Sequence, residues 1–581
     1  MTRTSASALQ LPGHAGAWNQ TDIPDVDLTD RHVVVITDSA APMDLARAVE
    51  SSARAVRVRL MTSTAVPTDL RSPTIVVTPV TSVRDMFNAI ASGPAPDVII
   101  EALESLDPRR SGAFGRLFLA LNDEGAYIFA RPGGEVRDTS VVWDWLRGRV
   151  EREVAGSDDR RPRRRSVEQA IGEAISSVTV NNGSVVVRKS GQHLMKIYNL
   201  LHRPDGESRL ETAVQRRAGA RAVERIATIP AEALEVETDL RTNNPDLAMK
   251  RFKRRYDVRP LVARVIRDAL CAPRQIISVD GLLLPESSMQ PRVQPMYNRS
   301  LIDDGDDYAE FPVSPGEDVA KLSGTYFHLD NEYPGHFGHV TSQDLTKLWA
   351  WESALYYDPD CRVLLSPPVG KSDLNEFQYR LLAAFGITRD RVTLLRGPVR
   401  VERLINATFG LQNPYFVSPR CKDIWQRIGA EVAAKSTVQA PKRLFVSRGD
   451  GLPRRCINGQ DVEQVFRDAG FEIILPEQFD IADQIKMFRE AEVVAGYAGS
   501  AMFNMVYSSA KTTWFVIGSR SYTATTEYLL AALYDDPIRY FFCDPVVEQP
   551  DGGWSSEAYF SNYTFNFERD GESLDRWLAE L

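Results

Sequence analysis

The sequence predicts an α/β protein with one Rossmann-like domain near the N-terminus and two further, facing Rossmann-like lobes in the C-terminal half. Short apolar runs alternate with amphipathic stretches over residues 31–146 and again from about residue 326 onward. This alternation is typical of parallel strands that are covered by helices. A chain of 581 residues is also too long for one hydrophobic core, so two to four domains are expected.

Composition and charge exclude several classes of protein. The hydrophobic share of 43% and the charged share of 25% are those of an ordinary globular protein. A net charge of -9 gives no general attraction for nucleic acid, so no nucleic-acid partner is expected. Oligomeric state is not indicated by any pattern.

The compartment follows from the cysteines and the apolar runs. The five cysteines are scattered and form no C-x-x-C pair, which favours reducing cytoplasm over a zinc ribbon or a disulfide framework. No stretch reaches the roughly 18 apolar residues that cross a bilayer. We therefore expect a cytoplasmic protein without a transmembrane segment, with peripheral contact at the inner face of the membrane left open.

The pattern along the chain divides it into segments. Residues 156–166, GSDDRRPRRRS, form a basic, Pro-containing run that indicates a solvated linker, with contact to a phosphorylated acceptor or lipid headgroup as the alternative. The predicted segments are a disordered N-terminus (1–30), a Rossmann-like domain (31–150), the basic linker (151–166), an α+β connecting segment (167–325), a first lobe (326–437) and a second lobe (438–581).

The domain at 31–150 is similar to a class I methyltransferase domain. Its later pieces, PDVII and LFLALNDEGAYIFARPGG, resemble the second half of such a domain in their order. The first strand, however, runs into DSAAPMD rather than into a glycine-rich turn that lets a cofactor approach the backbone. We therefore expect no bound cofactor in this domain.

The strongest local signal is EVVAGYAGSAMFN, residues 492–504. A buried strand ends at Gly496, the chain turns at Gly499, and a helix is expected to begin at Ser500. Bare N–H groups and the helix dipole favour an anion at such a turn. A purely structural tight turn is the alternative.

The residues before this turn resemble the C-terminal signature of glycosyltransferase family 61. The segment RLFVSRGDGLPRRCINGQ carries a strand ending in Ser-Arg and then an Arg-Arg-x-x-Asn box. It departs from the family at Ala498, where members commonly have His, and at Gly459, where an acidic residue often stands. The residues that fit the signature are Ser447, Arg448, Arg454, Arg455, Asn458, Pro476, Glu477, Gln484, Gly496, Gly499, Ser500 and Asn504.

The resemblance implies that this lobe binds the diphosphate of a nucleotide-sugar donor. Arginine presents a fixed fork of donors that suits phosphate oxygens, and we predict that Arg448 and Arg455 fill this role, with a surface ion pair as the alternative for each. The predicted donor-binding residues are Ser447, Arg448, Arg455, Asn458, Gln484, Gly496, Gly499, Ser500 and Asn504.

A second region, GTYFHLDNEYPGHFGHVTSQDLTKLWAWE, resembles the motif of the family's N-terminal lobe. His339 matches the motif histidine, and the acidic position falls on Gln343, with Asp344 one step later. Sugar transfer with inversion needs a base for the acceptor hydroxyl. We predict His339 as that base and Asp344 as the second candidate, with a capping or core histidine as the alternative for His339.

No metal site and no cofactor other than the donor, a co-substrate, are expected. His328, His336 and His339 lack a zinc-binding pattern. The Asp-x-Asp candidates, Asp358 with Asp360 and the run Asp303 to Asp307, are interpreted as solvated turns. The aromatic residues Trp349, Trp351, Tyr356 and Tyr357 are interpreted as a packing face rather than a sugar-stacking platform.

The resemblance implies an inverting, metal-independent glycosyltransferase of the GT-B type. It would move a sugar from a nucleotide-sugar donor, with UDP sugars the first candidates, to a glycan or glycoconjugate hydroxyl in cell-envelope polysaccharide biosynthesis. The first lobe would hold the acceptor and the second the donor. The alternatives are a catalytically inactive glycan- or nucleotide-binding protein of the same fold and a bifunctional methyltransferase-glycosyltransferase.

Overall fold

The computed structural model forms two compact units, which are described separately. Unit 1 comprises Met1–Ala222, Ser278–Ser287 and Pro291–Asp318, and unit 2 comprises Val223–Ile277, Ser288–Gln290 and Val319–Leu581. Most of the predicted disordered N-terminus and basic linker lies outside the described residues. The structure describes residues 26–39, 41–52, 56–66, 72, 74–103, 112–130, 164–181, 184–197, 205–290, 296–316, 318–449, 451–509 and 511–581.

Unit 1 contains a seven-stranded sheet of order β3-β2-β1-β4-β5-β8-β7. Five neighbouring strands are parallel, and β8 is antiparallel to both β5 and β7. The strands of this sheet are β1 (His32–Thr37), β2 (Arg57–Thr62), β3 (Ile75–Pro79), β4 (Val98–Ala102), β5 (Ala126–Phe129), β7 (Ile175–Asn181) and β8 (Ser184–Lys189). The helices of unit 1 are α1 (Pro42–Ser52), α2 (Val83–Ala91), α4 (Ala113–Leu117), η3 (Phe118–Ala120), α6 (Val167–Ala174), α7 (Gly206–Ala218) and η5 (Pro285–Ser287).

This sheet is the predicted Rossmann-like domain, extended by a hairpin. Val33, Val35, Leu60 and Ile100 belong to one buried cluster, as the continuous apolar runs predict for parallel strands with both faces covered. The hairpin β7–β8 comes from the predicted connecting segment. Its alternating pattern predicts strands, but the pattern does not say which sheet those strands join.

Unit 1 also holds short strands in the order β16-β9-β18-β17-β6. The pairs β9–β18 and β17–β18 are antiparallel, and Ser278 and Val279 of β15 pair with β16. These strands are β6 (Arg164–Arg165), β9 (Leu194–Lys196), β15 (Ile276–Val279), β16 (Leu282–Leu283), β17 (Ile302–Asp304) and β18 (Tyr308–Glu310).

Unit 2 contains two main sheets. The first has the order β21-β20-β19-β22-β14, with β10 on β14, and is parallel from β21 to β22. The second has the order β12-β29-β28-β27-β25-β26 and is parallel throughout, while β30 adds to β29 antiparallel. The strands of unit 2 are β10 (Val223–Ile229), β11 (Glu232–Glu235), β12 (Leu240–Thr242), β13 (Arg255–Val258), β14 (Leu261–Ala272), β19 (Ala320–His328), β20 (Arg362–Leu365), β21 (Val392–Leu394), β22 (Val399–Ala407), β23 (Leu411–Gln412), β24 (Phe416–Val417), β25 (Arg443–Val446), β26 (Glu472–Ile474), β27 (Val493–Tyr497), β28 (Thr513–Ser519), β29 (Ile538–Pro545) and β30 (Tyr563–Thr564).

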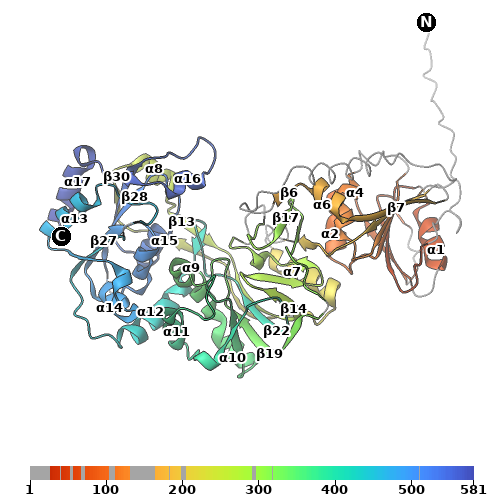
Figure 1. The fold of residues 1–581 in the computed structure, drawn as a ribbon, viewed down its shortest axis with the longest axis horizontal. Coiled ribbons are helices and arrows are strands. Elements are labelled where there is room, and N and C mark those ends of the chain that lie inside the picture. The colour runs from red at the N-terminus through yellow and green to blue at the C-terminus, as the bar shows by residue number, and fades with distance from the viewer. Residues whose placement is uncertain are drawn as a thin grey trace, which may run out of the picture. The chain divides into compact units, whose positions relative to one another are not determined.

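Helices cover both faces of the second sheet, as Figure 1 shows around β27 and β28. One face belongs to a core that runs through both sheets of unit 2, and the other packs against α13 and α17. The helices are α8 (Pro245–Arg251), α9 (Phe337–Ser342), η6 (Asp344–Ala350), α10 (Trp351–Tyr357), α11 (Glu376–Ala383), η7 (Arg389–Arg391), α12 (Arg420–Ala433), α13 (Gly459–Asp468), η8 (Pro476–Gln478), α14 (Ile481–Glu490), η9 (Ser500–Tyr507), α15 (Thr526–Tyr534), α16 (Ser556–Phe560) and α17 (Phe567–Ala579).

The α/β class is confirmed, and the structure distributes the predicted connecting segment 167–325 between the units. Within unit 2, β12 pairs with β29 of the second sheet and β14 pairs with β22 of the first. Among the residues that the structure describes, no helix has the length and apolar character that crossing a bilayer requires.

Candidate active site

The glycine turn and the Ser-Arg pair lie at one edge of the second sheet. β25 ends at Val446 and β27 at Tyr497, and the two strands are adjacent and parallel. Their following loops therefore leave the sheet at the same edge, where doubly wound sheets bind ligands. Gly496 is needed for strand packing, because a Cβ there would lie 2.8 Å from the carbonyl oxygen of Val446.

Two guanidinium groups approach the backbone at Gly499. A Cβ on this residue would lie 2.8 Å from Nη1 of Arg448 and 3.4 Å from Nη2 of Arg454. Its φ of 142° also favours glycine. The bare backbone of Gly499 thus lets both arginines reach the turn.

Arg454 has an unusual conformation and environment. Its φ is 62°, which is uncommon for a residue with a side chain and often marks a functional site. Its guanidinium carbon lies 4.3 Å from the ring centroid of Tyr522, 5.3 Å from that of Tyr559 and 5.8 Å from that of Phe560. Three aromatic rings therefore hold this side chain in place.

The two arginines carry buried donors for which the described residues provide no hydrogen-bond acceptor. Nε and Nη1 of Arg454 and Nε of Arg448 are buried without a hydrogen-bond partner in the described part of the chain. Burial and the nearby charge of Arg454 lower the pKa of Arg448. Because buried cations and donors are costly unless they are paired, this pair favours an anionic ligand.

Glu527, in the first turn of α15, reaches the same turn from another direction. It is fully buried, and its Oε1 accepts a hydrogen bond of 2.8 Å from the N–H of Gly499. Its Oε2 has no partner among the described residues. Burial raises the pKa of Glu527 from 4.5 to about 7, although the charge of Arg454 opposes this shift. The prediction of a bare amide at Gly499 is therefore wrong, since a carboxyl group occupies that amide.

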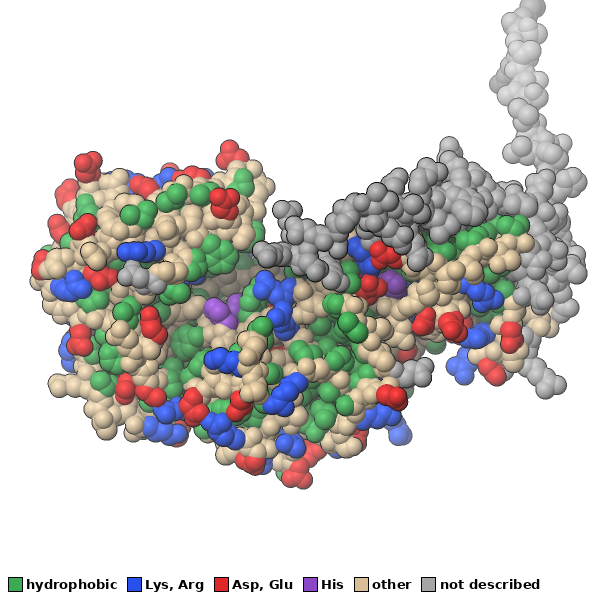
Figure 2. Space-filling model, in the orientation of Figure 1, with side chains coloured by type: hydrophobic (Ala, Val, Ile, Leu, Met, Phe, Trp, Pro, Cys, Tyr) green, Lys and Arg blue, Asp and Glu red, His purple; other side chains and the backbone are tan. Residues whose placement is uncertain are grey.

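The loop after β19 supplies His336, and the helix α9 that follows supplies His339. The ring of Tyr333 stacks on that of His339 at 4.5 Å between centroids, and the His336 ring lies 5.0 Å from His339. Desolvation and the positive charge of Arg454 lower the pKa of His336, so this loop and Arg454 are neighbours. Figure 2 shows histidine side chains beside a hollow on the visible face of unit 2.

Gln343 contacts the imidazole ring of His339. Its Nδ1 lies 2.7 Å from Oε1 of Gln343. Because an amide oxygen only accepts hydrogen bonds, Nδ1 of the neutral ring carries the proton and Nε2 carries the lone pair. Gln343, which stands at the family's acidic position, thus orients His339.

Asp344 supports the loop that carries Tyr333. It is buried, and burial raises the pKa of Asp344 well above its usual value. Its Oδ2 accepts a hydrogen bond of 2.6 Å from Nδ2 of Asn331, whose Oδ1 accepts the N–H of Tyr333. This chain of contacts fixes Tyr333, which in turn stacks on His339.

The first turn of α9 packs closely on the start of η9. A Cβ on Gly338 would lie 2.7 Å from Oγ of Ser500 and 3.2 Å from Cδ2 of Phe503. Ser500 therefore faces α9. η9 is a 3-10 helix rather than the predicted regular helix.

Most other predicted donor-binding residues have structural contacts. Ser447 Oγ donates to Oε1 of Glu463 at 2.6 Å, and Asn458 bonds both backbone groups of Phe565. Gln484 accepts a hydrogen bond of 3.1 Å from Nδ2 of the buried Asn504. These side chains hold loops and helices together near the strand ends.

The structure separates the members of the predicted arginine pair. Arg455 is exposed, and its backbone N–H bonds Asn562, so Arg454 and not Arg455 joins Arg448. Ala498 is buried, and a Cβ on Gly518 would lie 2.8 Å from its side chain. Sequence reasoning assigned no role to Arg454, Glu527 or the aromatic rings. The Arg-Arg pair was the signal for Arg454, whereas nothing local marks Glu527.

The predicted turns have different outcomes. Asp358 and Asp360 lie in a turn after α10, where Asp358 accepts a hydrogen bond from Thr325, which confirms that interpretation. The interpretation of Asp303 to Asp307 as solvated is wrong, because Asp303, Asp304 and Asp307 are buried. These aspartates can be buried because they form ion pairs with cationic side chains. The acidic run alone does not reveal those partners. His328 lies fully buried in β19.

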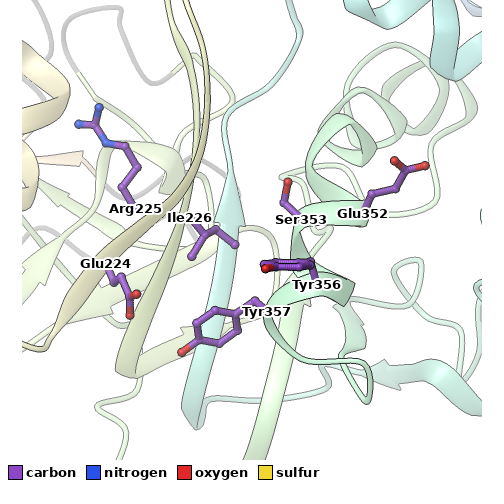
Figure 3. A pocket seen from close by; sticks show the side chains of 7 residues that line it. All are labelled: Glu224, Arg225, Ile226, Glu352, Ser353, Tyr356 and Tyr357. Atoms are coloured by element: carbon purple, nitrogen blue, oxygen red, sulfur yellow. The ribbon is translucent and has the colours of Figure 1, made fainter.

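A separate hollow of about 680 Å³ lies between β10 and α10 of unit 2 (Figure 3). Tyr356 and Tyr357 line it with Glu224, Arg225 and Glu352. The interpretation of this aromatic stretch as a packing face holds for Trp351, which is buried, and is wrong for Tyr356, which is 94% exposed. The ring of Tyr356 comes from the last turn of α10, on the side that turns away from the core.

Comparisons with known proteins agree with the site. The family model Glycosyltransferase 61 matches residues 326–515, a segment that contains His336, His339, Arg448, Arg454 and Gly499. This segment is similar to the glycosyltransferase 61 family. The match supports glycosyltransferase activity, which requires a sugar donor and an acceptor.

The other comparisons add little. No curated protein matches the chain. Among solved structures, the MycE methyltransferase of the mycinamycin biosynthetic pathway with Mg and SAH is 13% identical, with a TM-score of 0.23, over 28% of this chain and 44% of that one. Its complex with Mg, SAH and mycinamycin VI is 12% identical, with a TM-score of 0.22, over 28% and 45%. The chain thus spans less than half of these proteins, and scores this low do not bear on its activity.

Proposed function

We propose that unit 2 transfers a sugar with inversion from a nucleotide-sugar donor, with UDP sugars the first to test, to a hydroxyl of a glycan or glycoconjugate. The observation that carries the proposal is the convergence of Arg448 and Arg454 on Gly499, with buried donors that lack a hydrogen-bond partner among the described residues. A nucleoside diphosphate offers the oxygens that such forks bind. The two sheets would then act as GT-B lobes.

The same geometry supports a metal-independent reaction. In the proposed step, Nε2 of His339 takes the proton of the acceptor hydroxyl as its oxygen bonds to the anomeric carbon. The bond from that carbon to the diphosphate oxygen breaks, and the electron pair stays on the diphosphate. Arg448 and Arg454 stabilise this charge, the task that a divalent cation performs in other transferases. The proposed setting is cytoplasmic, in cell-envelope polysaccharide biosynthesis.

Thermal shift with a panel of nucleoside diphosphates and nucleotide sugars tests donor binding, because a ligand of the native state raises its apparent stability. We expect at least one diphosphate to raise the melting temperature of the full chain. Arg454→Gln should weaken this binding about 10-fold or more, as expected for a lost charged hydrogen bond. Arg455→Gln is the matched control.

A second measurement separates turnover from binding. Release of nucleoside diphosphate from a sugar donor should require His339, whereas donor binding should not. No shift with any diphosphate, or equal weakening in Arg454→Gln and Arg455→Gln, contradicts the proposed donor site. Binding without turnover favours the inactive binding protein over the enzyme.

A further inference from the structure

Unit 1 holds a cluster of ionisable side chains that the proposed transfer does not use. His193 precedes β9, Asp304 ends β17 and Glu310 ends β18. Nε2 of His193 lies 3.4 Å from Oε2 of Glu310 and 3.9 Å from Oδ2 of Asp304. Among the described residues this is the group whose ligand atoms, one from each side chain, lie within 4.8 Å of one another.

The facing atoms of this cluster are buried and unsatisfied. The side chain of His193 is 3% exposed and that of Asp304 is 0% exposed. Neither ring nitrogen of His193 has a hydrogen-bond partner in the described part of unit 1, and Oδ2 of Asp304 has none either. Buried polar atoms nearly always have partners in native proteins, so these atoms favour a ligand at their centre.

The cations near the cluster contact one oxygen of each carboxylate. Arg165 is the ion-pair partner of three carboxylates, namely Asp304 at 2.6 Å, Glu310 at 2.7 Å and Glu173. The charge of Lys196 also acts on Asp304, and that of Lys189 acts on Glu310. Arg165 binds Oδ1 of Asp304 and Oε1 of Glu310, so Oδ2 and Oε2 are left facing His193. These two oxygens therefore face the imidazole and not a cation of the described residues, and a divalent ion between them would supply the missing partner.

The neighbouring aspartates have cationic partners of their own. Asp307, at the same turn, forms ion pairs with Arg84 and Arg116. Asp303 forms ion pairs with Lys196 and Arg164. Each of these carboxylates therefore has two ion-pair partners, whereas Asp304 and Glu310 share Arg165 as theirs.

We propose that His193, Asp304 and Glu310 bind one divalent cation of the Zn²⁺ class, with water in the remaining position. One imidazole and two carboxylates suit Zn²⁺ better than Mg²⁺, which prefers oxygen ligands alone. Bonds of about 2.0–2.1 Å in tetrahedral geometry place ligand atoms roughly 3.3–3.5 Å apart. The separation of 3.4 Å between His193 and Glu310 fits this value, and the 3.9 Å between His193 and Asp304 requires Asp304 to move slightly closer. The ion would join the start of β9 to β17 and β18, and Arg165 would orient both carboxylates.

The test uses the full chain, free of any affinity tag and stripped of metal. Titration calorimetry with Zn²⁺ alone, and in parallel with Mn²⁺ and Mg²⁺, measures binding, and elemental analysis measures the metal retained on purification. The variants are His193→Gln and Glu310→Gln. Glu173→Gln is the matched control, because Glu173 contacts the same Arg165 but lies outside the proposed ligand set.

We expect one Zn²⁺ per chain, bound at least 100-fold more tightly than Mg²⁺. His193→Gln and Glu310→Gln should each weaken Zn²⁺ binding at least 10-fold, and Glu173→Gln should change it less than threefold. If His193→Gln does not fold, the result for Glu310→Gln decides between the outcomes. This variant is expected to fold because the side chain of Glu310 is partly exposed. Absence of Zn²⁺ binding, or equal binding in the ligand and control variants, overturns the proposal.

Discussion

Glu527→Gln is expected to change the pH dependence of stability in a defined direction. A folded pKa of about 7 against an ordinary 4.5 means that the native state binds the proton more tightly than the unfolded state. The associated stability is fully present below about pH 4.5 and is lost as the pH rises through 7. The full difference corresponds to about 3 kcal/mol, and this group is completely buried.

Gln is the appropriate replacement because its amide oxygen still accepts the N–H of Gly499 and it does not titrate. Its amide nitrogen introduces a cost that does not depend on pH. The difference in unfolding free energy between Glu527→Gln and the native protein should therefore move by about 2–3 kcal/mol in favour of the variant between about pH 5 and pH 8. Denaturant unfolding measures it through the buried Trp351, Trp425 and Trp514 of unit 2.

The same substitution should change donor binding. A diphosphate beside an ionised Glu527 is repelled, so the native protein should bind nucleoside diphosphate more weakly above pH 7, and Glu527→Gln should not. Asp536→Asn is the control: its carboxyl pKa is raised by burial to about 6, but it bonds Trp514 at the start of β28. A stability difference between Glu527→Gln and the native protein that stays flat from about pH 5 to pH 8 refutes the reasoning.

Three further predictions concern the rest of the site. His339→Gln should lower the transfer rate about 100-fold or more at unchanged donor affinity, as loss of a general base does; a comparison of kcat with the donor Kd checks this. Gly338→Ala should destabilise unit 2 by about 1–3 kcal/mol through the clash with Ser500, measured by denaturant unfolding. Ala498→His should cost a similar amount through overpacking against Gly518 and should not raise activity in a donor-hydrolysis assay.

The sequence predicts those parts of the site that lie at the carboxyl ends of strands. Arg448 and Gly499 follow neighbouring parallel strands, and the carboxyl ends of such strands always share one edge. His339 and its orienting Gln343 follow from the helical spacing of four residues. The apolar periodicity likewise predicted the parallel sheets of both units.

The choice between Arg454 and Arg455 could not be predicted, because it depends on one backbone angle. With φ at 62° the side chain of Arg454 lies among Tyr522, Tyr559 and Phe560, and that of Arg455 is on the exposed side of the loop. The sequence LPRRC does not indicate that φ of Arg454 is positive. Strand pairings between distant segments could not be predicted either. For example, β12 pairs with β29 across almost 300 residues. Short strands carry too little sequence pattern to specify their partners.

Glu527 explains how the arginine pair can exist without a ligand. Two buried cations near one turn repel each other, and without an anion their burial would be costly. A carboxyl group with a pKa of about 7 can hold negative charge while the site is empty and can take up a proton when a diphosphate arrives. Donor binding is therefore expected to be accompanied by proton uptake near neutral pH, and calorimetry in buffers of different ionisation enthalpy would detect it in the native protein and not in Glu527→Gln.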